Sequence, residues 1–435
     1  MKDNLDKTVK QKNIKRTSQM NNSIKNTNNK IDQNLESNVK ILSSTHFLGG
    51  LYFNMLWAIR QPFFLSLNSS MTFIGLLEGI GGFNGIMTPI SQLIGGWLSD
   101  KNGRKKYVII ASLSIISAMI FFLIAGYTKL VFFLIPAMLF FGASTISWPS
   151  FDSIIAESVS EEKMAISYSI FMFAGVVPGI FSPYLGGKIA DLFGYLPVFS
   201  LGIFIEILCL ILIVLYLKET LFMKNKERSN FSQFLILLKD SFKIPKILRN
   251  FYIATIVDIF VWGLGSSILY GMLRKTFNFS VSQIGILTCM TSISWAITQI
   301  PVGRLIEKFG CKIFLILSEL IGVITMFGFL ISTKYEHFLI FAFIWGMVAS
   351  TWVPTMKILI ANSVDKTKRG EAIGKLSFFR GLFGFPAPFI GGILFDNFGF
   401  KIPILTNLIG AFIAAILIFL LIHESPKGKL AYKTQ

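Results

Sequence analysis

The sequence predicts an all-α membrane protein in which twelve transmembrane helices form two pseudo-symmetric six-helix bundles. Three observations predict this fold class. Of the 435 residues, 53% are hydrophobic and only 15% are charged, whereas about a quarter of the residues in a soluble domain are charged. Twelve apolar segments are each long enough for a helix to cross a membrane, which takes roughly 20 residues. Finally, the first half of the chain resembles the second half.

The repeat is clearest over Ile155–Tyr195. This stretch reappears without an insertion 205 residues later, so that Pro183 corresponds to Pro388 and Asp191 corresponds to Asp396. In a strongly apolar chain, a repeated unit of this size indicates two similar membrane halves that face each other across an axis. This plan favours a transporter over an enzyme.

The apolar segments follow one another with short loops between most of them. We place the helices at residues 46–67, 72–99, 107–127, 130–157, 164–190, 195–217, 250–273, 280–305, 312–333, 336–363, 370–396 and 400–422. They are uniformly apolar, whereas the strands of a membrane barrel alternate polar and apolar residues. Residues 1–42 are polar and lack aromatics, so we expect a disordered tail rather than a signal peptide.

The longest loop divides the chain in two. We expect an N-terminal six-helix bundle at residues 43–218, a cytoplasmic linker at 219–249, a C-terminal bundle at 250–423 and a second cytoplasmic tail at 424–435. An amphipathic helix on the membrane surface is expected in the linker, and a mobile linker is the alternative. The apolar residues at helical spacing there are Phe231, Phe234, Leu235, Leu238 and Phe242.

Lysine and arginine gather on one side of the predicted bundle. They lie in the first tail, in the linker, and in the loops at 101–106, 304–312 and 366–369, while the loops of the other side carry few. Because cytoplasmic loops carry the excess of basic residues, we expect a cell-membrane protein with both termini in the cytoplasm. This distribution explains the formal charge of +18 without nucleic acid, which we do not expect as a partner.

The sequence contains no pattern for bond-making chemistry. Its three histidines and three cysteines are scattered, and it has no HExxH, GxSxG or Walker A motif. We therefore expect no enzyme activity, no cofactor and no metal site. With no site for ATP, an ion gradient would have to drive uphill transport, and protons are the default ion.

A motif of glycine and charged residues follows the second apolar segment. It reads GGWLSDKNGRKK over residues 95–106, and a weaker copy, GRLIEKFGCK, occupies residues 303–312 after the eighth segment. Both copies resemble the loop signature of the major facilitator superfamily, and the resemblance extends from about residue 46 to residue 422. It implies two six-helix halves around a central cavity that is lined by the first, fourth, seventh and tenth spans.

The resemblance also implies a gate at the motif. Asp100 and Arg104 would help to hold the cytoplasmic side closed, with Glu157 and residues near the start of the eleventh span as partners. Topology-setting charge without a gating role is the alternative. The candidate gate residues are Gly96, Asp100, Gly103, Arg104, Glu157, Gly303, Glu307 and Gly310.

The fifth span resembles the antiporter motif of the same superfamily. The resemblance is carried by Pro178, Pro183, Gly186 and Gly187. Two glycines of that motif are replaced, by Pro178 and Ser182, and the arginine that many drug exporters carry in the fourth span is missing. These departures leave the antiporter assignment open. Proline and glycine predict a close-packed, bendable helix here.

Charged residues within the spans indicate where ions or substrate bind, because each must be paired, hydrated or protonated. Asp152, Lys357 and Asp258 are expected at a similar depth in one wet pocket, in which drying would favour protonation of the carboxylates. Arg60 and Glu78 are placed to form an ion pair in the extracellular half. Buried structural ion pairs are the alternative for these residues.

Three further charged residues lie deep in the predicted spans. Arg380 is near the midplane of the eleventh span. Glu206 and Glu319 occupy spans that the resemblance places at the lipid-facing periphery, so we expect them to be neutral or turned inward. Aromatic residues would line a pocket for an amphipathic substrate or serve in packing and the interface belt. They are Trp57, Phe63, Trp148, Trp262, Tyr270, Trp345 and Trp352.

These observations predict a monomeric secondary transporter that works by alternating access. The function we favour is proton-coupled efflux of small amphipathic organic compounds, that is, antiport. One alternative is a proton symporter that imports a sugar or another metabolite. Another is a non-transporting membrane receptor or scaffold on the same fold.

Overall fold

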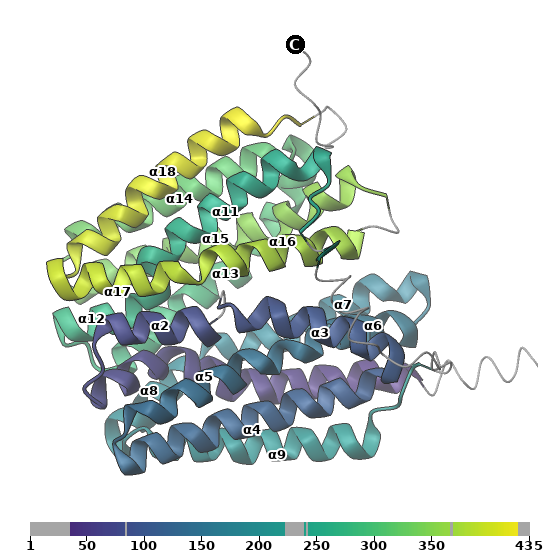
Figure 1. Cartoon of the computed structure of the whole chain (residues 1–435), viewed down its shortest axis with the longest axis horizontal. Helices are drawn as coiled ribbons and strands as arrows, with labels where there is room; N and C mark the ends of the chain where they lie inside the picture. The colour runs from purple at the N-terminus through teal and green to yellow at the C-terminus, as the bar shows by residue number, and fades with distance from the viewer. Residues whose placement is uncertain (1–34, 83–84, 222–238, 241, 366–368, 425–435) are drawn as a thin grey trace, which may run out of the picture.

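The computed structural model describes residues 35–82, 85–221, 239–240, 242–365 and 369–424. Figure 1 shows an all-helical molecule built from two stacked bundles. The helices up to α9 form one bundle, and the helices from α11 to α18 form the other. We refer to these bundles as the N-half and the C-half.

The N-half begins with a helix at residues 35–66. Its other helices are α2 (Met71–Gly81), α3 (Met87–Asn102), α4 (Arg104–Thr128), α5 (Leu134–Ala143), α6 (Trp148–Ser158), α7 (Glu161–Val176), α8 (Ser182–Phe193) and α9 (Leu196–Tyr216). Those of the C-half are α11 (Arg249–Gly265), α12 (Leu269–Phe277), α13 (Val281–Phe309), α14 (Cys311–Ile331), α15 (Tyr335–Ser363), α16 (Arg369–Gly384), α17 (Pro386–Phe398) and α18 (Lys401–Leu421).

The helices account for the predicted membrane crossings. In the part of the chain that is described, ten helical stretches are long and apolar enough to span a membrane. The helix at residues 35–66 and the pair α2 and α3 are consistent with two further crossings, as the predicted total of twelve requires. The all-α membrane fold class is therefore confirmed.

The first helix extends into the segment that we expected to be the tail, because residues 35–42 are helical. The side-chain amide of Asn38 explains this start: it donates to the Ser158 hydroxyl (3.1 Å) and to the Lys218 carbonyl (3.1 Å), and its oxygen accepts from the Lys218 N–H (2.9 Å). Residues 1–34 and most of the expected linker helix lie outside the described residues. Phe242, at the end of that linker pattern, packs its ring 5.2 Å from the ring of Phe378.

Proline interrupts the fifth crossing, for which the sequence predicts a close-packed, bendable helix. Pro178 lies in a 3-10 turn, Val177–Ile180, and Pro183 is in the first turn of α8. Proline has no N–H to donate and its ring clashes with the preceding helical turn. The crossing is therefore divided into α7 and α8.

The two ends of the bundles differ in how the halves meet. We call the end with the loops at Gly103, Val159–Ser160 and Gly310 the basic side, and the end with the loops at 67–70, 194–195, 278–280 and 399–400 the non-basic side. On the non-basic side, α2 packs against α17 and α8 packs against α13, and a single cluster of buried apolar residues joins both halves.

The basic side is organised differently. Two further clusters of buried apolar residues lie there, one built from the N-half and one from the C-half. Among the described residues, these two cores contain no residue from the opposite half. The molecule is therefore closed at the non-basic side, with separate cores at the basic side.

Candidate functional site

The non-basic side is held by two carboxylates in equivalent positions. Asp191, near the end of α8, accepts hydrogen bonds from the N–H groups of Val281 (3.0 Å) and Ser282 (2.9 Å) at the start of α13. Asp396, near the end of α17, accepts from the N–H groups of Met71 (3.2 Å) and Thr72 (2.7 Å) at the start of α2. The first N–H groups of a helix lack partners within it and carry partial positive charge. Each half therefore caps a helix of the other.

Glycine allows the backbones to meet beside these carboxylates. A Cβ atom on Gly187 would lie 2.5 Å from the Val281 carbonyl oxygen, and one on Gly392 would lie 2.3 Å from the Met71 carbonyl oxygen. Both distances are too short for a side chain. Of the antiporter-like residues, Pro178 is buried in the turn before α8, and Pro183, Gly186 and Gly187 are buried in α8 itself.

Arg60 and Glu78 are brought together, as expected. Arg60 Nε and Nη2 donate to the two Glu78 oxygens over 3.0 and 2.7 Å, and both side chains are buried. Gln61 links this pair to the C-half, because its amide nitrogen donates to Glu78 (3.0 Å) and to the Ser267 carbonyl (2.6 Å). Its oxygen accepts from the Gly271 N–H (2.8 Å).

The Arg60 guanidinium lies between two aromatic rings. Its carbon is 5.0 Å from the Trp57 ring centre and 5.2 Å from the Phe141 ring centre. Such contacts between a cation and a ring are favourable when water is excluded. Arg60 Nη1 is buried and has no hydrogen-bond partner among the described residues.

Asp258 pairs with Arg380 rather than with Lys357. Arg380 Nη1 donates to the Asp258 carboxylate over 2.8 Å and to the Thr255 carbonyl over 3.3 Å. The carboxyl groups of Asp258 and Glu319 are close enough to interact electrostatically. Glu319 is thus turned inward, one of the two placements expected for it.

Asp152 and Lys357 remain at the basic end. Both are exposed, and their charges interact at a distance, since no salt bridge joins them among the described residues. The pocket expected to hold three charged residues is therefore divided. The charge of Asp152 interacts with that of Lys357, whereas Asp258 belongs to a separate buried group within the C-half.

The gate motif forms a network within the N-half. Arg104 donates to Asp100 and, over 3.1 Å, to Glu157, while Glu157 accepts from the Thr220 hydroxyl. Glu219 accepts from the N–H groups of Arg104 (2.8 Å) and Lys105 (3.2 Å), and so caps α4. Residues 366–368, beside the expected partner at the start of the eleventh span, are outside the described residues.

The weaker copy of the motif keeps only part of this arrangement. Gly310 has nearly the same backbone conformation as Gly103: φ is 89° at Gly310 and 103° at Gly103. A positive φ in this range favours glycine. Glu424 accepts from the N–H groups of Cys311 (2.8 Å) and Lys312 (2.7 Å) and so caps α14. Gly96 would place a Cβ 3.6 Å from Pro149, whereas a Cβ on Gly303 would meet nothing within 4 Å. Glu307 is exposed.

Sequence reasoning did not find the two capping glutamates. Glu219 and Glu424 stand 205 residues apart, the same spacing as the repeat over Ile155–Tyr195. This spacing could have identified them as a pair. Their partners are backbone N–H groups, which leave no mark in a pattern of side chains.

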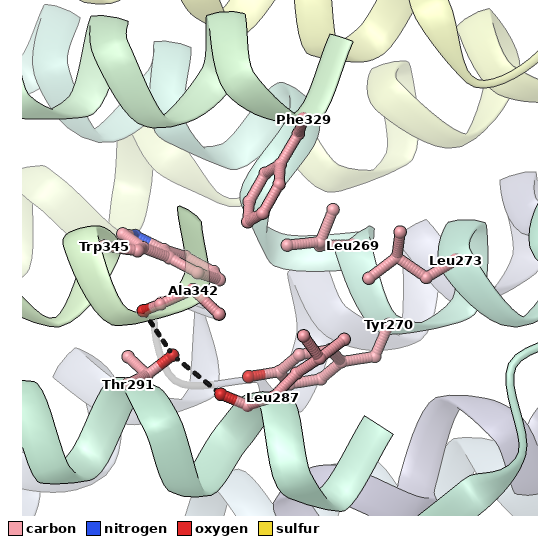
Figure 2. Close-up of a pocket in the computed structure, with 8 residues that line it drawn as sticks. All are labelled: Leu269, Tyr270, Leu273, Leu287, Thr291, Phe329, Ala342 and Trp345. Atoms are coloured by element: carbon pink, nitrogen blue, oxygen red, sulfur yellow. Dashed lines mark hydrogen bonds between the residues drawn. The ribbon is translucent and has the colours of Figure 1, made fainter. Parts of the chain in front are cut away.

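The aromatic residues divide between packing and pocket lining. Phe63 is buried among other rings, with its centre 4.7 Å from that of Phe199, whereas Trp148 is exposed. Figure 2 shows a pocket within the C-half that Tyr270 and Trp345 line, together with Leu269, Leu273, Leu287, Thr291, Phe329 and Ala342. Its cavity volume is only about 10 Å³, about the space that one water molecule needs and too small for an organic compound.

The hydroxyl of Thr291 in this pocket is already satisfied. It donates to the carbonyls of Leu287 (3.1 Å) and Ala342 (3.2 Å), as Figure 2 shows. The pocket therefore offers little to a polar ligand. In the part of the chain described, no group of three or more His, Cys, Asp or Glu side chains is arranged to hold a metal ion.

Comparisons with known proteins agree with this architecture. The sequence family described as Major Facilitator Superfamily matches residues 42–257 and 251–434. An uncharacterized MFS-type transporter of Methanocaldococcus jannaschii is 24% identical over 82% of this chain and 93% of its own length. Multidrug resistance protein MdtG of Proteus mirabilis is 22% identical over 78% of this chain and 82% of its own length.

Solved structures share the fold. The crystal structure of a D-xylose-proton symporter superimposes with a TM-score of 0.66, covering 90% of this chain and 100% of its own, at 16% identity. Likeness at this identity concerns the fold and does not extend to the substrate.

Proposed function

Because this chain belongs to the major facilitator superfamily, and is accordingly a multi-pass membrane transporter, we propose that it exports small amphipathic organic compounds in exchange for protons. Export is supported by the similarity to multidrug resistance proteins named MdtG. It is further supported by the buried prolines and glycines that pack α8 against α13. We expect the protein to act as a monomer in the cell membrane.

The proposed mechanism is alternating access between the two halves. The basic side is taken as cytoplasmic because basic loops are retained there, which places both termini in the cytoplasm. The single observation that carries the mechanism is the arrangement of the apolar cores, joined at the non-basic side and separate at the basic side. This arrangement corresponds to a state that is closed toward the outside.

The opposite state would exchange these contacts. The caps at Asp191 and Asp396 would open, and the cytoplasmic ends would approach each other around Asp100, Arg104 and Glu157. Substrate would bind between the halves near Asp152 and Lys357, whose side chains are exposed at the basic end. A rigid core with two discrete arrangements is the usual basis for such switching.

Dye accumulation in cells tests the direction of transport. Cells that express the protein are compared with cells that do not express it. An amphipathic cationic dye should accumulate less in cells with the native chain. Greater accumulation would indicate the import alternative, and equal accumulation would favour the receptor or scaffold.

A further inference from the structure

The C-half contains a buried group of three charged side chains from three different crossings. Asp258 comes from α11, Glu319 from α14 and Arg380 from α16. Asp258 is 3% exposed and Glu319 is 1% exposed. Counting along the helices from their basic ends at about 1.5 Å per residue, the three lie at similar depths of roughly 12–16 Å. The group is therefore near the middle of the membrane.

The contacts within this group are specific. Arg380 Nη1 donates to Asp258 over 2.8 Å, and the Asp258 and Glu319 carboxyl groups are close enough to interact electrostatically. The Trp262 indole N–H donates to Glu319 over 3.2 Å. The Trp352 ring lies 5.6 Å from the Arg380 guanidinium carbon, and the Arg380 side chain is the most accessible of the three charged groups, at 17% exposure.

Charge counting shows that this group requires a proton. Two ionised carboxylates that lie close together repel each other strongly where water is excluded, and one proton shared between them removes this repulsion. With one proton, the pair carries a single negative charge, which Arg380 balances. Without it, one negative charge is left uncompensated within the bilayer, which is strongly unfavourable.

The other packed helices carry their charged residues toward their ends. α15, which packs on α14, carries Glu336 in its first turn and Lys357 about two turns from its basic end, and no salt bridge among the described residues joins Lys357 to this group. α3, which packs on α16, carries Asp100 and Lys101 at its basic end, and the charged residues of α13 lie in its last two turns. α17 and α18, which pack on α11, carry only Asp396 and Lys401, both at the non-basic end, and Asp396 is engaged with α2. The remaining charged residues of α16 lie in its first two turns, toward the basic end. They are Arg369, Glu371 and Lys375.

The matching place in the N-half is built differently. Tyr52 and Ser112 stand 206 and 207 residues before Asp258 and Glu319, so hydroxyl groups replace the two acids. Glu206 of α9 accepts from the Tyr52 hydroxyl over 2.6 Å and hydrogen-bonds Ser112. A single acid with two hydroxyl partners requires no shared proton. The paired acids are thus a feature of the C-half.

We propose that Asp258 and Glu319 hold one exchangeable proton between their carboxyl groups and form the proton-binding site of the transporter. This proposal rests on the proposed proton coupling. Arg380 sets the number of protons that the pair binds. When Arg380 lies beside the pair, it balances one negative charge, so the pair holds one proton. When Arg380 moves away, that negative charge is no longer balanced and the pair binds a second proton. Its partial exposure connects the buried acids to the space between the halves.

Infrared spectroscopy of the purified full-length protein tests the site without relying on transport. The carbonyl band of protonated carboxyl groups is measured at neutral pH, and variants are compared with the native chain. Glu319→Gln should lose one protonated carboxyl per protein, since Asp258 and Arg380 then form a neutral pair. Asp258→Asn should do the same and serves as the second variant if the first is unstable. Arg380→Gln should gain one protonated carboxyl.

Two matched variants define the background. Glu206→Gln assigns any contribution from the other buried acid, and Glu336→Gln, at an exposed position in the first turn of α15, should leave the band unchanged. A band that Glu319→Gln and Asp258→Asn leave intact would overturn the proposal, whatever the transport activity. Failure of the proposed function would appear separately, as the absence of proton-linked flux by the native chain in liposomes.

Discussion

Asp191 and Asp396 occupy equivalent positions in the two halves, and each caps the first turn of a helix in the other half. Their carboxylates accept N–H groups of α13 over 2.9–3.0 Å and of α2 over 2.7–3.2 Å. This reciprocal contact joins the halves at the non-basic side. Opening that side requires both caps to separate from their helices.

We therefore expect Asp191→Ala and Asp396→Ala each to favour opening of the non-basic side. Loss of a helix cap costs about 0.5–2 kcal/mol, which should lower the ratio of closed to open molecules by roughly 2- to 30-fold. Hydrogen exchange at the N–H groups of Val281, Ser282 and Thr72 measures this directly. Asn caps helices almost as well as Asp, so the Asn variants should keep most of the protection. Equal exchange in the Ala variants and the native chain would refute the role of these caps.

Gly187→Ala should loosen the contact between α8 and α13. Its Cβ would lie 2.5 Å from a backbone oxygen that cannot move aside alone, and such overpacking costs about 1–3 kcal/mol. Gly374→Ala is the matched control, because a Cβ there meets nothing within 4 Å and Ala favours a helix by about 1 kcal/mol. The temperature of thermal unfolding in detergent should be lower for Gly187→Ala than for the native chain. For Gly374→Ala it should be unchanged or higher. The same shift in both would contradict the packing argument.

Glu78→Gln should strongly destabilise the protein. It leaves the buried Arg60 charge without its partner, which costs about 3–5 kcal/mol. The double variant Arg60→Met, Glu78→Leu should recover much of this loss, because it removes both charges together. Glu36→Gln breaks an exposed pair with Lys163 and should change the unfolding temperature little. If Glu78→Gln and Glu36→Gln unfold at the same temperature, the Arg60–Glu78 pair does not stabilise the protein.

Asp152→Asn should weaken binding of cationic compounds while keeping the proton stoichiometry. Its side chain is exposed at the basic end and is separate from the Asp258 group. Loss of about 1 kcal/mol of attraction corresponds to a roughly fivefold increase in KM. Transport kinetics with a cationic and a neutral compound measure the effect, which should be confined to the cation. A change in protons moved per substrate would place Asp152 in the coupling site instead.

The sequence predicted the crossings well because hydropathy is a local property. The last span was expected at 400–422 and is found at Lys401–Leu421. Depth along a helix was also predictable, which is why Arg60 and Glu78 were placed opposite each other. The rotation of a helix about its own axis, which decides the neighbour that a side chain faces, cannot be obtained by counting residues. Asp258 was accordingly assigned to one pocket with Asp152 and Lys357, whereas it faces Arg380 and Glu319.

Backbone partners were the other part that the sequence could not show. Asp191, Asp396, Glu219 and Glu424 all act on helix N–H groups that lie far away in the chain. Any residue except proline supplies such a group, so no side-chain pattern identifies it. The repeat pairs these acids, and only the fold shows what they bind.

Transport in liposomes with an imposed pH gradient tests the central claim most directly. Purified protein is reconstituted, an amphipathic cationic dye is supplied at equal concentration on both sides, and dye and proton movements are followed together. The account predicts that dye accumulates in the more acidic compartment while protons move the opposite way, and that both flows are absent from protein-free liposomes. Dye that stays evenly distributed, with no proton movement beyond that of the protein-free control, would contradict it.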